Sequence, residues 1–76
     1  MNWQERIAAD QNVCHGKACI RGARVMASVV LDNLAAGEAA DEIARDYRIT
    51  PEDVQASLLY AAELAKERIV HLAATR

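Results

Sequence analysis

The spacing of hydrophobic residues changes near residue 26. Residues 1–25 hold short apolar runs at 7–9 and 18–20, separated by Asp10-Gln11-Asn12, Gly16 and Gly22. Glycine, asparagine and aspartate favour turns, so this part predicts two short strands in a β-hairpin arm over residues 1–26. A lone two-stranded ribbon is marginally stable in water. The arm is therefore expected to pack on the rest of the chain.

From residue 27 the apolar residues recur at helical spacing. A first helix is predicted from about Ser28, ending before Gly37, which suits the left-handed position after a helix. A second helix is predicted over residues 40–47. Its expected inward-facing side chains are those of Ile43, Ala44 and Tyr47.

The strongest local signal lies at Thr50-Pro51, where a third helix is predicted to begin. Threonine caps helix N-termini, and proline fits the first helical position. One apolar stripe follows at helical spacing, formed by Val54, Leu58, Ala61, Ala65, Ile69 and Leu72. Because no breaker follows Pro51, the helix is predicted to reach about residue 74, a length of ~35 Å. That exceeds the needs of a small domain, so the end of the helix either frays or contacts a partner or a second copy, through Ala65, Ile69, Val70 and Leu72.

Together these elements predict a mainly α fold in one domain over residues 1–76. A short N-terminal β-hairpin (1–26) precedes a trihelical, helix-turn-helix core with a long C-terminal helix (27–76). The turn of the predicted helix-turn-helix lies at residues 48–50, with Ile49 closing it. This arrangement is common, and DNA binding is one of several uses.

Composition makes oligomerisation an expectation. The chain has 76 residues, of which 53% are hydrophobic and 4% aromatic, and much of its apolar content is alanine. Chains this short bury little surface and often need a partner, so we expect a homodimer. No apolar run is long enough to cross a membrane and no signal peptide is evident. The expected localisation is cytoplasmic, without membrane association.

Positive charge gathers in one stretch of a chain whose net charge is −2. Residues 14–25 carry three basic residues and no acid, whereas residues 26–63 carry eight acids against two arginines. If DNA is bound, the expected contacts are Lys17, Arg21, Arg24, Arg45, Arg48 and Gln55. The alternative is that these are ordinary surface charges.

The start of the third helix is a poor match to DNA. In a helix-turn-helix this end meets base edges, and here it offers Glu52, Asp53, Gln55 and Ala56. Two carboxylates would repel phosphates, although Gln55 could read adenine.

Cys14, His15 and Cys19 invite comparison with a metal or redox site. Structural zinc takes four ligands and this stretch offers three, while a disulfide is unusual in a reducing cytoplasm. We favour packing and turn roles. Neighbours on a strand point to opposite faces, so His15 is not expected to act as a base for Cys14. No enzyme activity, metal or cofactor is expected.

The chain resembles the bacterial and archaeal family called domain of unknown function 433. The similarity covers roughly residues 5–62. It is carried by Ile7, Asp10, Gly16-Lys17, Ile20, Gly22, Arg24-Val25, Val30-Leu31, Leu34-Ala35, Gly37, Glu42-Ile43, Asp46-Tyr47, Thr50, Glu52-Asp53-Val54, Ala56 and Tyr60-Ala61. The resemblance implies a β-hairpin before a trihelical, homeodomain-like core, and a VapB-like antitoxin role beside a PIN-like nuclease.

This sequence departs from the family pattern at four places. Gln11, Ala18 and Ala23 stand where the family usually has Pro, Pro and Thr. Ala39 replaces a Ser or Thr cap, which weakens the second helix by ~1 kcal/mol.

Four functions remain open at this point. The leading hypothesis is an antitoxin-like protein that binds and neutralises a PIN-like nuclease, with operator DNA as a second ligand. The main alternative is a stand-alone helix-turn-helix transcriptional regulator without a toxin partner. A purely structural interaction module is another, and an enzyme whose activity depends on Cys14 or His15 is the least favoured.

Overall fold

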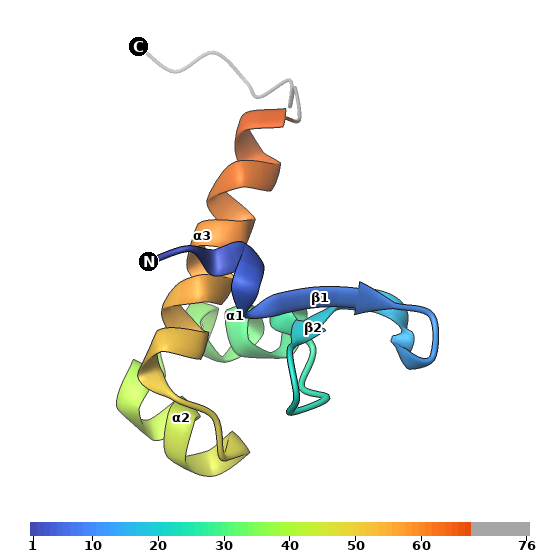
Figure 1. Cartoon of the computed structure of the whole chain (residues 1–76). Helices are drawn as coiled ribbons and strands as arrows, with labels where there is room; N and C mark the ends of the chain where they lie inside the picture. Colours follow the sequence, from blue (N-terminus) through green and yellow to red (C-terminus); the bar gives the residue numbers. More distant parts are fainter. Residues whose placement is uncertain (68–76) are drawn as a thin grey trace, which may run out of the picture.

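The computed structural model describes residues 1–67, a β-hairpin followed by three helices. The element order is η1 (Trp3–Glu5), β1 (Ile7–Asp10), β2 (Val13–Ile20), α1 (Ala27–Ala35), α2 (Ala40–Tyr47) and α3 (Pro51–Glu67). Figure 1 shows α3 as the long axis, the hairpin projecting to one side, and α1 and α2 at its base. The expected continuation to residue 74, with Ile69, Val70 and Leu72, lies outside the described residues.

The hairpin is antiparallel and interrupted by a large bulge. Ile7 pairs with Ile20 and Ala9 with Ala18, but the next pair is Asp10 with Val13. Four residues of β2 (14–17) therefore have no partner on β1. At the tip, the Asp10 carboxylate accepts a hydrogen bond from the Asn12 N–H at 2.8 Å, which fixes the predicted turn.

The predicted helix boundaries are largely confirmed. α1 ends as expected, with Gly37 in a left-handed conformation at φ +95°, and α2 spans residues 40–47. Ala39 stands at the N-cap of α2 and supplies no side-chain hydrogen bond, because its methyl group cannot accept one. The short η1 helix was not predicted. Within residues 1–67 no helix is long and apolar enough to cross a membrane.

The core joins all the elements. Its largest fully buried aliphatic side chains are those of Ile20, Val30, Ile43 and Val54. Trp3 of η1 packs edge-on against Tyr60 of α3, with ring centroids 5.6 Å apart. The hairpin arm is thus held to the helices at its start, as its marginal stability requires.

Two inward-facing predictions are wrong. Tyr47 is 37% exposed and Leu58 is 42% exposed. The Tyr47 hydroxyl accepts a hydrogen bond from the Asn33 side-chain amide at 3.0 Å, which keeps the ring at the surface beside α1. On α3 the buried face instead includes Ala56 and Ser57, whose small side chains permit close packing.

Candidate functional site

The α2–turn–α3 unit is the first candidate site. Residues 48–50 connect the helices, and Arg48 adopts a left-handed conformation with φ 57° and ψ 42°. The Ile49 N–H donates to the Ala44 carbonyl at 2.9 Å, and the Ile49 side chain is buried. Ile49 therefore closes the turn as predicted and fixes the start of α3 relative to α2.

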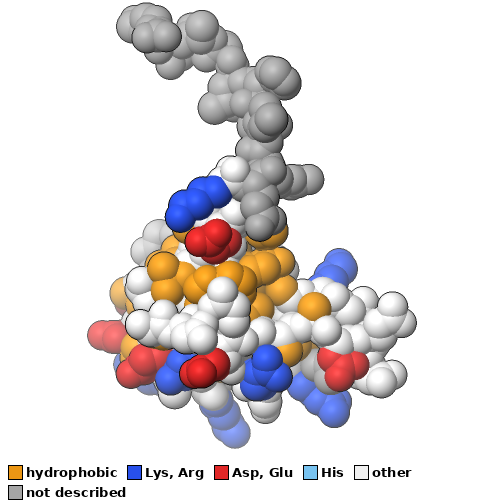
Figure 2. Space-filling model, turned by 45° about the horizontal axis from the view of Figure 1, so that its top comes forward, with side chains coloured by type: hydrophobic (Ala, Val, Ile, Leu, Met, Phe, Trp, Pro, Cys, Tyr) orange, Lys and Arg blue, Asp and Glu red, His pale blue; other side chains and the backbone are white. Residues whose placement is uncertain are grey.

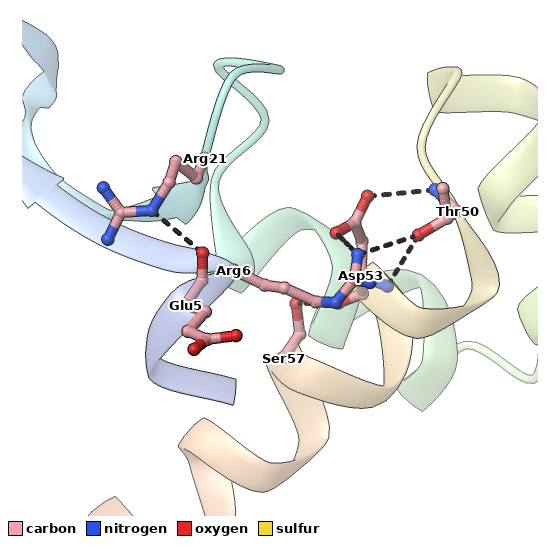
Figure 3. Close-up of polar contacts among 6 residues, drawn as sticks. All are labelled: Glu5, Arg6, Arg21, Thr50, Asp53 and Ser57. Carbon is pink, nitrogen blue, oxygen red and sulfur yellow. Dashed lines mark hydrogen bonds and ion pairs between the residues drawn. The ribbon is translucent and has the colours of Figure 1, made fainter. Parts of the chain in front are cut away.

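A reciprocal cap fixes the first turn of α3. The Asp53 N–H donates to Thr50 Oγ1 at 3.1 Å, and the Thr50 N–H donates to Asp53 Oδ2 at 3.0 Å. This is a capping box with aspartate in the acidic position. Arg6 then donates from Nη1 to Asp53 Oδ1 at 3.1 Å, bringing the N-terminal segment to the same point (Figure 3).

The outward face of α3 differs from the predicted one. Asp53 turns into the cap and Ala56 is fully buried, so neither faces solvent as a base-reading position would. After Pro51, which is itself exposed, the exposed side chains on the first turns are Glu52, Gln55 and Leu58. This face carries one acid, one amide and one large apolar group, and no cation.

Arg21 has a structural partner set. Its guanidinium donates to the Glu5 carbonyl at 3.0 Å (Figure 3). It also donates to the carbonyls of Gln4 at 3.4 Å and Ile7 at 3.5 Å. These bonds hold the end of η1 against the hairpin. Arg21 is exposed, yet its donors are directed at the protein's own backbone.

The other predicted DNA contacts are exposed, and two of them line separate hollows. Lys17 lines a first hollow and Arg24 lines a second. Arg45 and Arg48 lie near the end of α2, and Tyr47 beside them shares the second hollow with Arg24. Of the proposed interface residues, Ala65 is exposed, and the other three lie outside the described residues.

The first hollow lies between the hairpin, α1 and α3 and is largely apolar. Figure 2 shows hydrophobic side chains gathered at the centre of this face of the molecule, with the hairpin projecting beside them. The hollow measures about 650 Å³. It lacks the convergent polar groups typical of small-molecule sites. Its larger side chains are Trp3, Leu31, Tyr60 and Leu64.

The second hollow corrects one prediction about the hairpin. Cys14, His15 and Gly16 all have left-handed backbones, with φ of 53°, 56° and 81°. Strand alternation fails across such a run, and Cys14 and His15 line the same hollow. Gly16 accordingly lies inside this bulge and not in a turn between strands.

Cys19 lies beside this hollow, in the core. It is 2% exposed, and burial, followed by the neighbouring Cys14 thiol, raises the pKa of the Cys19 thiol. Among residues 1–67 no three metal-ligating side chains come together.

Two of these contacts left no local signal in the sequence. Arg6 and Asp53 are separated by 47 residues, and their pairing depends on how η1 packs on α3. The three acceptors of Arg21 are backbone carbonyls, which every residue offers. Sequence patterns could identify Thr50 and Asp53 as a cap, but not the arginine that joins them.

Comparison with known proteins supports the hairpin-and-helix architecture. No curated protein matches this chain. A solved structure from Mycobacterium tuberculosis, Rv2018, is similar with a TM-score of 0.67 and 26% sequence identity. The match covers 74% of this chain and 27% of Rv2018, so the shared unit is a minor part of that protein. The family model described as protein of unknown function (DUF433) matches residues 7–61, and the chain therefore belongs to this family.

Proposed function

We propose that this protein is an antitoxin-like, non-enzymatic binding module of the cytoplasm that binds and neutralises a PIN-like nuclease. The proposal rests on the family resemblance and on the interpretation of the α2–turn–α3 unit as a homeodomain-like helix-turn-helix. We further propose that the protein is a homodimer and that operator DNA is its second ligand. The observation that carries it is the outward face of α3, which is better suited to protein than to DNA.

The charge of this face argues against a DNA-reading role for α3. Phosphate neutralisation by lysine and arginine supplies most non-specific DNA affinity. Glu52 and Gln55 stand where such cations would be needed, and Leu58 lies beyond them with 42% of its surface exposed. An exposed leucine with no cation on the same face can pack on an apolar partner surface but cannot neutralise phosphates.

A second apolar surface lies on another side of α3. Leu64 is 40% exposed and borders the first hollow with Tyr60 and Trp3. Aromatic side chains that are partly buried before binding lose little entropy and often dominate interface energies. The combination supports a partner that contacts α3 on more than one side.

The test is affinity purification of the tagged protein from its native host at native expression, with and without nuclease treatment. Retention of a small PIN-like protein in both arms is expected. Leu58→Asp should abolish retention because it places a charge in the contact. The control is Ala36→Asp, since Ala36 is exposed at the far end of α1. Wild-type protein that retains no PIN-like protein would refute the proposal.

A stand-alone transcriptional regulator is the second candidate. It is favoured by the exposed arginines Arg24, Arg45 and Arg48, which flank the end of α2 and the second hollow. In that case Arg24→Ala and Arg48→Ala should each weaken operator binding and reduce its salt dependence. Lys66→Ala is the control, because Lys66 pairs with Glu63 far along α3. DNA binding equally weakened by Lys66→Ala would indicate general charge attraction.

A further inference from the structure

We propose that Cys14 and Cys19 form a thiol pair that is reversibly oxidised to an intramolecular disulfide by low-molecular-weight disulfides such as oxidised glutathione. This modification site is independent of the proposed partner. Both cysteines are free thiols in the structure.

The two thiols meet at one short segment of chain. The Cys14 thiol donates to the Arg24 carbonyl, with Sγ 3.4 Å from the oxygen. The same segment pairs with the far end of β2, through an isolated bridge between Cys19 and Met26 and a 2.7 Å hydrogen bond from the Ile20 N–H to the Val25 carbonyl. Cys14 also lies close enough to Cys19 to raise the pKa of the Cys19 thiol. The bulge thus brings together two residues that a regular strand would hold apart.

Their unequal exposure gives the two thiols different roles. Cys14 is partly exposed and lines the second hollow, whereas Cys19 is 2% exposed. An incoming reagent therefore reaches Cys14 first, and Cys19 is positioned to resolve the product. Arg24 and His15 border the same hollow, and a cation there attracts an anionic tripeptide such as glutathione.

The backbone around Cys14 can accommodate the bond. A disulfide requires Cα atoms about 4.4–6.8 Å apart and a specific dihedral angle. Residues 14–17 have no pairing partner on β1, so Cys14 can shift without breaking the ladder. The new bond replaces the weak hydrogen bond from Cys14 to the Arg24 carbonyl.

The reaction balances as two thiol–disulfide exchanges. The Cys14 thiolate attacks one sulfur of oxidised glutathione and releases a glutathione thiolate. The Cys19 thiolate then attacks the Cys14 sulfur of the mixed disulfide and releases the second glutathione. The two cysteine protons pass through solvent to the two glutathione thiolates. The protein loses two hydrogens, and one oxidised glutathione becomes two reduced molecules.

The test exposes the whole chain to oxidised glutathione and measures free thiols, intact mass and the linked peptides. Wild-type protein should lose both thiols, with a mass decrease of two hydrogens, and a Cys14–Cys19 linked peptide should appear. Reduction should restore both thiols. Cys19→Ala should stop at one glutathione per chain on Cys14, because nothing resolves the adduct.

Several outcomes would overturn the proposal. Wild-type protein that keeps a stable glutathione adduct on Cys14, or that forms disulfide-linked dimers, would show that Cys19 does not resolve it. Failure of any thiol to react without denaturant would show that Cys14 is inaccessible. Peptide mapping of wild-type protein decides the question even if Cys19→Ala does not fold.

Discussion

Arg6 and Asp53 form an ion pair that joins the start of the chain to the start of α3, with Nη1 3.1 Å from Oδ1. Asp53 is also one half of the α3 cap, through Thr50. A single carboxylate therefore anchors both the N-terminal segment and the first turn of a helix. Asp53, whose charge was expected to oppose DNA binding, is therefore a structural residue.

Replacing Asp53 by alanine should lower the free energy of unfolding by about 2 kcal/mol, the sum of a lost cap and a partly exposed ion pair. Arg6→Ala should cost about half as much because the cap survives. Urea unfolding measures both. Glu52→Ala is the matched control, since Glu52 is an exposed neighbour, and a loss as large as that of Asp53→Ala would contradict the assignment.

Arg21→Ala should destabilise the protein by about 1–3 kcal/mol, because three backbone carbonyls of the N-terminal segment lose their donor. Arg24→Ala should leave the thermal midpoint within a few degrees. Thermal unfolding of the two variants separates them. If both are equally stable, the Arg21 hydrogen bonds contribute nothing measurable. Any loss of DNA binding on replacing Arg21 must be corrected for this effect.

Arg48→Gly should stabilise the fold by about 0.5–1 kcal/mol. A left-handed conformation costs a residue with a Cβ roughly 1–2 kcal/mol, and Arg48 has φ 57° and ψ 42°. Part of that gain is offset by the greater freedom of glycine in the unfolded chain. Arg45→Gly, inside α2, should instead destabilise by about 1 kcal/mol. Chemical denaturation of the pair tests the sign, and destabilisation by Arg48→Gly would refute the argument.

Val54→Ala should cost about 1–3 kcal/mol, because Val54 is 1% exposed in the core. Leu58→Ala removes a larger side chain, yet it should change the free energy of unfolding by less than about 1 kcal/mol since Leu58 is 42% exposed. Denaturant midpoints compare the two directly. A greater loss of stability for Leu58→Ala than for Val54→Ala would mean that α3 buries the face that carries Leu58.

Stability should fall at alkaline pH through Cys19. Its pKa is raised above the ordinary value of 9.0, chiefly by burial, so the folded state holds this proton more tightly than the unfolded state. The contribution is complete below pH 9.0 and is lost as the pH rises through the folded-state pKa. Thermal unfolding from neutral to alkaline pH should show a smaller alkaline loss for Cys19→Ala than for wild-type protein. Equal losses of stability in the two proteins would contradict the role of Cys19.

Local signals predicted most of the fold, while side-chain contacts between distant segments escaped them. Gly37 and the Thr50-Pro51 pair marked helix ends correctly, because capping depends on neighbouring residues. The hydrophobic stripe placed Leu58 inside because leucine is apolar. The fold instead buries Ser57, whose hydroxyl donates to the Asp53 carbonyl at 3.2 Å and so needs no other partner.

The bulge shows a second limit of sequence patterns. Left-handed conformations are expected for glycine, and Gly16 has one. Cys14 and His15 share it, although neither residue type predicts it. The same limit applies to the candidate DNA contacts. The sequence predicts that Lys17 and Arg24 are exposed, but their placement in separate hollows depends on how the hairpin bends.

The contacts of Trp3 with Tyr60 and of Arg6 with Asp53 also constrain how the chain acquires its structure. Each closes a loop that spans most of the described chain, and the second has a sequence separation of 47 residues. During synthesis the hairpin arm leaves the ribosome before the helix that holds it. The arm therefore has no docking surface until α3 emerges, and folding of the whole unit awaits that moment.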